Sequence, residues 1–225
     1  MENIFYIGFS FYKESLIQKQ NVEKSTLLAK QAQLEMLRYQ LNPHFLFNTF
    51  STLRALVRNN KNIIAEKVIT KISEFLKYSL LEGEDSFVNL SKEISIINHY
   101  LDIEKIRFGE KLDVTFDIDP NTESIMVPVF LIHPIIENAV KHGMKTSPSP
   151  LVIIIKTRLF SDSLIIEVSN SGKWIEKEKD DMIICTGLEN TKKRLKLAYP
   201  EMHSYDIIKK EDHVKIKIII NNENT

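Results

Sequence analysis

Residues 40–48 read Gln-Leu-Asn-Pro-His-Phe-Leu-Phe-Asn, and this stretch divides the first half of the chain into separate helices. The residue before a proline is driven out of the α region, and asparagine followed by proline suits the N-cap and first position of a helix. A kinked or restarted helix is therefore predicted to carry His44 in its first turn and to continue to about Arg58. We expect the ring of His44 to point outward and residues 45–47 to turn inward.

Helical patterns lie on both sides of this stretch. Residues 13–40 contain no glycine or proline, which favours a helix. Leucines recur there every seven residues, as in a helix that pairs with another helix, at Leu27, Leu34 and Leu41. After an asparagine-rich turn, apolar residues of helical period predict another helix over 64–76. Ser91 with the nearby Glu93 predicts a further helix through about Arg107.

After Gly109 the pattern changes to strands mixed with helices. Residues 114–118 alternate apolar and polar side chains, as in a half-buried strand. Helices are predicted from about Pro128 to His142 and from Thr186 to Ala198. Further strands are predicted at 151–159, 164–168, 205–208 and 214–220. Helices followed by a mixture of strands and helices predict an α+β chain whose two domains meet near residue 110.

Composition limits the classes of function. Hydrophobic residues make up 43% and charged residues 27% of the 225 residues, which is typical of a soluble globular protein. Thirty basic residues balance thirty acidic ones, which argues against a large nucleic-acid footprint. The single cysteine, Cys185, excludes an internal disulfide and a cysteine-rich metal site.

The first twelve residues form an aromatic-rich stretch that is followed by Lys13, Lys19 and Lys24. It is too short to span a bilayer and lacks the features of a signal peptide. Two interpretations stay open. The stretch is either a helix start packed on a dimer mate, or the cytoplasmic tail of a membrane segment with the lysines on the inner side.

His44 is the first candidate for chemistry. A histidine ring is in large part unprotonated near neutral pH, so one ring nitrogen can act as a nucleophile. Asn48, four residues later, shares its helix face and can hydrogen-bond the ring to select a tautomer. The run over 40–48 resembles the phosphoacceptor motif of the LytS/YehU family of sensor histidine kinases. That resemblance implies that His44 receives a phosphoryl group from ATP.

A second constellation is Ile-Glu-Asn-Ala-Val-Lys-His-Gly over residues 136–143. On a helix, Asn138 and His142 share one face, and Glu137 and Lys141 share the adjacent one. An amide oxygen suits Mg²⁺, and a carboxylate beside it can hold a metal-bound water or accept a proton. Read alone, these residues are a solvated helix end. The stretch resembles the N box of the GHKL ATPases, which implies that Asn138 holds Mg²⁺ and that all four residues line the nucleotide site.

A third constellation, Val-Ser-Asn-Ser-Gly over residues 168–172, ends a predicted strand. It resembles the G1 box, in which an aspartate accepts a hydrogen bond from adenine and glycines let the base approach. Asn170 stands in place of the aspartate, Gly172 is retained, and Trp174 replaces the second glycine. An asparagine oxygen can accept the same bond without charge assistance. Without the resemblance, the tripeptide is an ordinary turn at the end of a strand.

A fourth constellation, Thr186-Gly187-Leu188-Glu189, is a capping box, and a helix N-terminus is a ready anion site. It resembles the G2 box, whose amides cradle phosphates, although Cys185 stands where that family has a glycine. Residues 173–184, charged and poor in glycine, are expected to form a lid over the nucleotide. Arg194 extends the match, as do residues 100–108.

The resemblance runs from about residue 34 to residue 220 and implies a homodimeric sensor histidine kinase. Its parts are a helical dimerisation and phosphoacceptor region over 13–110 and an α/β sandwich ATP-binding (Bergerat or GHKL) domain over 111–225. They follow residues 1–12, for which the tail of a membrane segment is one of the two open interpretations. We expect ATP and Mg²⁺ as cofactors and the cytoplasmic side of the cell membrane as the location, with this chain itself soluble. Lys141 and Arg194 are candidates for phosphate contacts.

The catalytic residues implied are His44 as nucleophile, Glu137 as base and Asn48 as orienting partner. Phe45 occupies the position where many histidine kinases have an acid, so the base stays open. The phosphoryl group would pass to an aspartate of a response regulator of the LytTR type, without direct contact with nucleic acid. The alternative is a non-catalytic module that binds nucleotide or a partner at a degenerate site.

Overall fold

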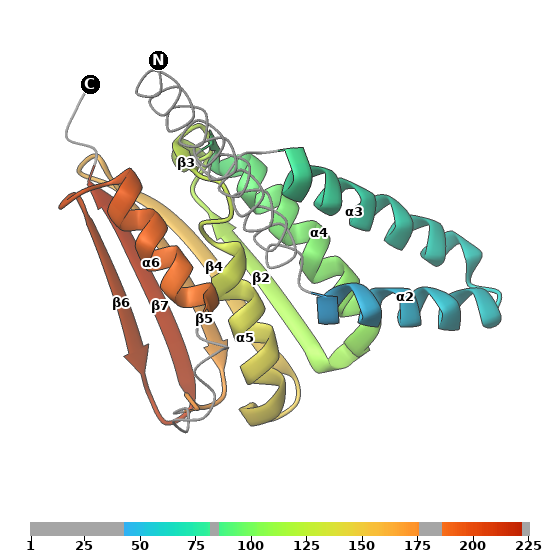
Figure 1. The fold of residues 1–225 in the computed structure, drawn as a ribbon. Coiled ribbons are helices and arrows are strands. Elements are labelled where there is room, and N and C mark those ends of the chain that lie inside the picture. Colours follow the sequence, from blue (N-terminus) through green and yellow to red (C-terminus); the bar gives the residue numbers. More distant parts are fainter. Residues whose placement is uncertain (1–42, 82–85, 176–185, 222–225) are drawn as a thin grey trace, which may run out of the picture. The chain divides into compact units, whose positions relative to one another are not determined.

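A computed structural model describes residues 43–81, 86–175 and 186–221 (Figure 1). The chain divides into two compact units, Met1–Asn48 and Thr49–Thr225. In chain order, the elements are α2 (Pro43–Arg58), α3 (Asn62–Leu81), β1 (Phe87–Asn89), α4 (Leu90–Phe108), η1 (Gly109–Lys111), β2 (Leu112–Ile118), η2 (Pro120–Thr122), β3 (Met126–Pro128), α5 (His133–Thr146), β4 (Leu151–Phe160), β5 (Ser163–Ser171), α6 (Thr186–Ala198), β6 (His203–Lys209) and β7 (His213–Asn221).

The helices and strands have the α+β order that the sequence predicts, with helices first and a mixed sheet after them. The expectations for residues 1–40 and for most of the lid, 176–184, lie outside the described residues. The boundary near residue 110 separates a region expected to dimerise from one expected to bind nucleotide. It stays a prediction.

The second unit contains a five-stranded sheet in the order β2-β4-β5-β7-β6. Strands β2 and β4 are parallel, and every other neighbouring pair is antiparallel. A parallel pair needs a long crossover connection, and here that connection contains α5. The β4–β5 hairpin turns through Ser161 and Asp162, which both have positive φ. These residues lie between the strands that the sequence predicts at 151–159 and 164–168.

Helices α5 and α6 cover one face of this sheet (Figure 1). Strand residues alternate between buried and accessible positions, and the buried positions face the helices. The sheet contributes a row of buried β-branched side chains to this core: Ile153, Ile155, Ile166, Val168, Ile216 and Ile218. Helix α5 contributes Ile135, Ile136, Ala139 and Val140. Each fully buried aliphatic side chain contributes about 1.5–3 kcal/mol, so this packing fixes the position of α5.

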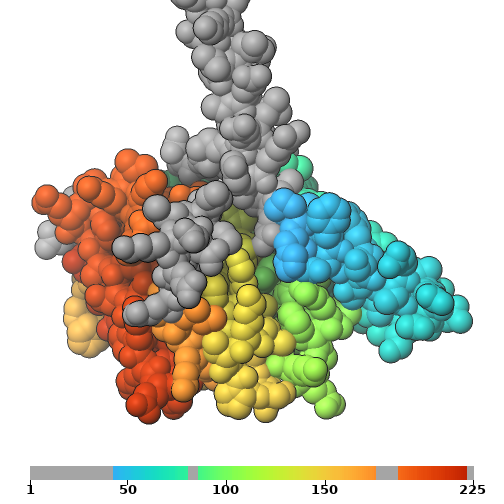
Figure 2. Space-filling model, turned by 60° about the horizontal axis from the view of Figure 1, so that its bottom comes forward, coloured from blue at the N-terminus to red at the C-terminus, as the bar shows by residue number. Residues whose placement is uncertain are grey.

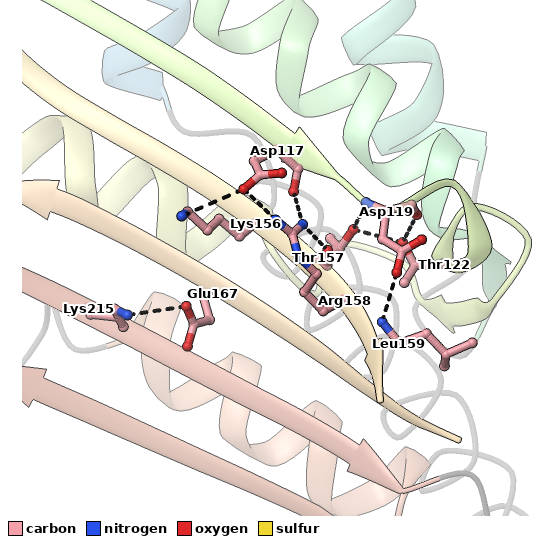
Figure 3. A network of polar contacts seen from close by, with 9 residues as sticks. All are labelled: Asp117, Asp119, Thr122, Lys156, Thr157, Arg158, Leu159, Glu167 and Lys215. Carbon is pink, nitrogen blue, oxygen red and sulfur yellow. Dashed lines mark hydrogen bonds and ion pairs between the residues drawn. The ribbon is translucent and has the colours of Figure 1, made fainter. Parts of the chain in front are cut away.

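The opposite face of the sheet carries a row of charges that alternate in sign from strand to strand. In register across β2, β4, β5, β7 and β6 are Asp117, Lys156, Glu167, Lys217 and Asp206. Figure 3 shows Asp117 with Lys156 and Arg158, and Glu167 with Lys215, whose Nζ lies 3.2 Å from a Glu167 carboxylate oxygen. Opposite charges on neighbouring strands stabilise such a face without a further layer.

The predicted helix from about Pro128 to His142 is wrong at both ends. Residues 126–128 form the short strand β3, paired with β1, and the helix begins only at His133. The cause is a partner distant in sequence, which no local pattern reveals. The helix also continues through Gly143 to Thr146. A Cβ on Gly143 would lie 2.5 Å from a methyl of Leu151, so this glycine serves close packing inside the helix instead of ending it.

His133, the first residue of α5, is buried in an aromatic cluster. Its ring centre lies 5.0 Å from that of Phe75, 4.9 Å from that of Tyr100 and 5.6 Å from that of Phe130. No described residue hydrogen-bonds its Nδ1. Burial lowers the pKa of His133 to about 4.

This low pKa predicts a loss of stability in acid. The unfolded chain binds a proton at this ring near pH 6.5, whereas the folded chain does so only near pH 4. The free energy of unfolding should therefore fall as the pH drops through this window, by about 3 kcal/mol from His133 alone. His133→Gln, which is neutral and of similar volume, should lose less stability than the wild type in denaturant titrations between pH 7 and pH 4. Equal losses of stability in the two proteins would contradict a lowered pKa of His133, since the two proteins share all other titratable groups.

Candidate functional site

His44 lies in the first turn of α2, directly after Pro43, and its side chain is exposed. The Nδ2 of Asn48 lies 3.2 Å from both ring nitrogens of His44. The amide can donate only to a ring nitrogen with a free lone pair, and the tautomer decides which of the two nitrogens accepts. The i, i+4 contact that the sequence predicts is present.

The residues after His44 do not all turn inward as expected. Phe45 is buried, but the side chain of Phe47 is 73% exposed. Helical geometry explains the difference, because residue i+3 lies on nearly the same face as residue i. Phe47 and His44 therefore occupy one accessible face of α2 together with Asn48.

Helix α5 carries the second set of predicted residues along the edge between its buried face and solvent. Glu137, Asn138 and His142 are half-buried, and Lys141 is exposed. The amphipathic pattern of α5 causes this, because the neighbouring positions pack into the core. The amide of Asn138 and the carboxylate of Glu137 are therefore held by a rigid helix and still reach the surface.

The charge of Glu137 acts on two side chains of α4, Glu104 and Tyr100, and neither was predicted from the sequence to be a site residue. Burial raises the pKa of Glu104, the charge of Glu137 raises it further, and Arg107 opposes this with Nη1 at 3.3 Å. Burial also raises the pKa of Tyr100, and the negative charges of Glu104 and Glu137 raise it further. The charge of Glu137 therefore acts on a second carboxyl group, which is paired with an arginine. The i, i+3 spacing of Glu104 and Arg107 on a helix was the feature of the sequence from which this ion pair could have been predicted.

Asn170 lies near the end of β5, and its side chain is 8% exposed. It packs against α5, because a Cβ on Gly143 would lie 3.4 Å from Asn170 Nδ2. That Nδ2 donates to the carbonyl of Ser171 over 2.8 Å. Gly143, the residue of α5 beside Asn170, lies one to two helical turns after Asn138.

The turn after Asn170 is pressed against the end of α5. Gly172 has φ +101°, and a Cβ there would lie 2.5 Å from Thr146 Oγ1 and 2.8 Å from Ser147 N. Any other residue would be strained at this φ and would collide with α5. The backbone N–H of Lys173 donates to Thr146 Oγ1 over 3.1 Å. Trp174 is half-buried, and Lys209 Nζ lies 4.9 Å from its ring centre.

Helix α6 begins at Thr186, as the capping box predicts, and its start lies beside the first turn of α5. A Cβ on Gly187 would lie 3.5 Å from Pro134 Cβ, and Leu188 is half-buried. Further along, Arg194 donates to the carbonyl of Val129. This arginine supports the segment before α5, a contact that the sequence did not predict.

The three predicted nucleotide stretches therefore meet around one helix. Figure 2 shows the surface of α5, in yellow, beside that of the end of β5, in orange. Gly187 lies next to Pro134 and Asn170 next to Gly143. These two α5 positions are nine residues apart, about 13 Å at 1.5 Å per residue, a span that an extended nucleoside triphosphate can bridge. Glu137, Asn138, Lys141 and His142 fall between them.

Two surface hollows lie elsewhere. One, of about 570 Å³, lies at the start of α4 beside Met126, and the other, of about 420 Å³, lies between α3 and α4 beside Gly109. Neither contains a residue predicted to bind nucleotide. The candidate site is defined instead by the predicted nucleotide-binding residues that lie around α5. In the described part of the chain, no three His, Cys, Asp or Glu side chains lie close enough to hold a metal ion together.

Comparisons with known proteins identify the family. A family model for histidine kinases matches residues 32–112. The sensor protein LytS of Staphylococcus saprophyticus is 32% identical over 176 residues, which cover 78% of this chain and 30% of LytS. The chain belongs to the LytS family of histidine kinases.

Other histidine kinases match this LytS-family chain over similar or longer stretches. The sensor histidine kinase YpdA of Escherichia coli is 29% identical over 97% of this chain and 39% of its own length. YesM of Bacillus subtilis is 28% identical over 85% of this chain and 33% of its own length. The chain thus spans about a third of the length of these relatives.

A solved histidine kinase domain from Erythrobacter litoralis overlaps 84% of this chain and 92% of its own, with 14% identity and a TM-score of 0.47. No helix among the described residues of this chain is both long and apolar enough to cross a membrane.

The position of Asn170 predicts how nucleotide affinity responds to substitution. Asn170→Ala removes the acceptor and should weaken binding of a non-hydrolysable ATP analogue by about three- to tenfold, since one neutral hydrogen bond contributes about 0.5–1.5 kcal/mol. Asn170→Asp supplies a charged acceptor but cannot donate to the Ser171 carbonyl, so it should tighten binding by only a few-fold. Calorimetry on the three proteins measures this. Equal affinities would make Asn170 a turn residue only.

Proposed function

We propose that this chain is the catalytic part of a sensor histidine kinase, which binds MgATP along α5 and transfers the γ-phosphoryl group to His44. The observation that carries the proposal is the meeting of three separate stretches around α5: Gly187 at its start, Asn138 in its middle and Asn170 near its end. Membership of the LytS family supports the reaction type.

In the proposed reaction, an unprotonated ring nitrogen of His44 attacks the γ-phosphorus. A nitrogen–phosphorus bond forms, the bond from the γ-phosphorus to the β–γ bridging oxygen breaks, and ADP leaves with that electron pair. The other ring nitrogen then gives up its proton. Phosphoryl transfer depends chiefly on positioning and charge neutralisation. Asn48 holds the ring through its amide, which supports a fixed orientation of the nucleophile.

Glu137 is the first candidate for the base that receives the proton. It is anchored on α5, its charge acts on the Glu104–Arg107 pair, and Arg107 partly offsets the repulsion between the two carboxyl groups. The neighbour of His44 is Phe45, which cannot accept a proton. A carboxylate on the nucleotide helix is therefore the group best suited to this role.

The donor set around Asn138 fits a magnesium ion. Mg²⁺ takes oxygen ligands and keeps several waters, so one amide oxygen together with phosphate oxygens is sufficient. When bound, the ion would neutralise charge on the transferred phosphoryl group. Asn138 would orient the ion, and the N–H groups at the start of α6, with Lys141, would hold the phosphates.

The proposal extends to partners. Exposed apolar side chains lie on α2 and α3: Phe47, Phe50, Val57, Ile63, Ile69 and Leu80. Such a surface on two helices suits a homodimer, in which the phosphate donor comes from either protomer. The phosphohistidine would pass its phosphoryl group to an aspartate of a response regulator, for which the family resemblance favours the LytTR type, at the cytoplasmic side of the membrane.

His44→Gln should abolish phosphorylation while nucleotide affinity stays unchanged, since the amide lacks a nucleophilic nitrogen. The assay uses the purified chain, radiolabelled ATP and Mg²⁺, and measures acid-labile phosphate. His213→Gln, at another surface histidine that is hydrogen-bonded to Asp212, is the matched control and should remain active. Acid-labile phosphate on the His44 variant would assign the reaction to one of the other five histidines.

The same assay separates the proposal from a non-catalytic nucleotide-binding module, the alternative suggested by Asn170 and Trp174. Asn138→Ala should lower the rate by about 10- to 100-fold at limiting Mg²⁺, whereas Asn98→Ala, an exposed asparagine on α4, should not. A wild-type chain that binds the nucleotide but never becomes labelled would favour the alternative.

A further inference from the structure

Residues 129–132, which join β3 to α5, are held in an unusual conformation. Phe130 has φ +56°, in the left-handed region that a bulky side chain rarely occupies. A residue remains there only when its surroundings impose it. The segment ends at Ile132, and α5 begins at the next residue.

A single carboxylate fixes this segment from the α4 side. Glu93 is 1% exposed, and its Oε2 accepts a hydrogen bond from Phe130 N over 3.1 Å. Its Oε1 accepts one from Ile132 N, also over 3.1 Å. The two bonds hold the backbone on both sides of residue 131. Burial raises the pKa of Glu93, and hydrogen bonds from Tyr78 and from the backbone oppose that rise.

The same carboxylate reaches a third element. The Tyr78 hydroxyl on α3 donates to Glu93 Oε2 over 2.6 Å, and its ring packs edge-on against Phe130 with centres 5.0 Å apart. Helix α3 follows α2, the helix that carries His44. Glu93 therefore connects α3 and α4 to the point where the nucleotide helix starts.

We propose that Glu93 is a positioning residue for phosphoryl transfer, which sets the start of α5 and thereby the direction in which Glu137 and Asn138 face the nucleotide. The inference rests on the proposed nucleotide site. Successive helix residues are about 100° apart around the axis, so the direction of each side chain depends on how the helix is rotated. A small change in the backbone of residues 130–132, just before α5, would rotate the helix and turn Glu137 and Asn138 together. An error of about 1 Å in placing reacting groups can lower a rate by about 100-fold.

Two variants test this role. In Glu93→Gln the amide presents an N–H₂ group to a backbone N–H donor, so one bond becomes a donor–donor contact. Tyr78→Phe removes one hydroxyl and keeps the ring. The matched control is Asp102→Asn, on the same helix as Glu93. Asp102 pairs with Lys71 of α3 over 2.7 Å, so this variant removes an α3–α4 contact away from residues 129–132.

The measurements are the KM for ATP and the kcat of His44 phosphorylation, the dissociation constant of a non-hydrolysable ATP analogue, and the melting temperature. All activity and binding measurements are made well below the melting temperature of each variant. Glu93→Gln should raise the KM and the dissociation constant by about tenfold, and Tyr78→Phe by about threefold. Asp102→Asn should match the wild type in both constants.

Equal binding and kinetic constants in all four proteins, with only lower melting temperatures, would overturn the inference and leave Glu93 a purely structural residue. If Glu93→Gln does not fold, the comparison of Tyr78→Phe with Asp102→Asn decides. A wild-type chain that binds no nucleotide would overturn the proposed function and this inference together, so the two failures are distinguishable.

Discussion

The buried carboxylate of Glu93 is the constraint on which the arrangement of helices and site depends. It accepts hydrogen bonds from Tyr78, Phe130 and Ile132, and so joins α3, α4 and the segment that leads into α5. Replacing it would leave buried donors without acceptors, each at a cost of about 1–3 kcal/mol. Phe130 keeps its left-handed backbone because these bonds and the surrounding aromatic rings hold it there.

From this anchored start, α5 becomes the axis of the candidate site. Its buried face packs on the sheet, and its edge presents Glu137 and Asn138. The missing side chain at Gly143 lets Leu151 and Asn170 approach, and the missing side chain at Gly172 lets the end of β5 rest on the end of the helix. The opposite face of the sheet is different in character, since a row of charges that alternate in sign from strand to strand crosses it, and Figure 3 shows part of this row. The start of α6 and the side chains of Asn138 and Asn170 lie on the helix-covered side of the sheet.

Much of the fold was predictable because its signals are local. The capping box places the start of α6 at Thr186, Pro43 starts α2, and runs of β-branched residues mark β4, β5 and β7. Strands β1 and β3 were missed because each has three residues and is stabilised by the other, about 40 residues away in the sequence. Among the site residues, Asn170 and Gly187 could be proposed from sequence because their motifs are contiguous. The role of Glu93 could not, because an acid near a helix start usually reads as a favourable charge at that helix end, and only the fold reveals that it is buried and bonded to a segment almost 40 residues later.

The central claim is that the nucleotide lies along α5, between the start of α6 and the end of β5. Amide hydrogen exchange with and without Mg²⁺ and a non-hydrolysable ATP analogue tests it most directly. The account predicts slower exchange in α5, at the start of α6 and in residues 170–174. It predicts unchanged exchange in β2, which forms one edge of the sheet. Slower exchange confined to the hollows beside Met126 or Gly109, with α5 unaffected, would contradict the account.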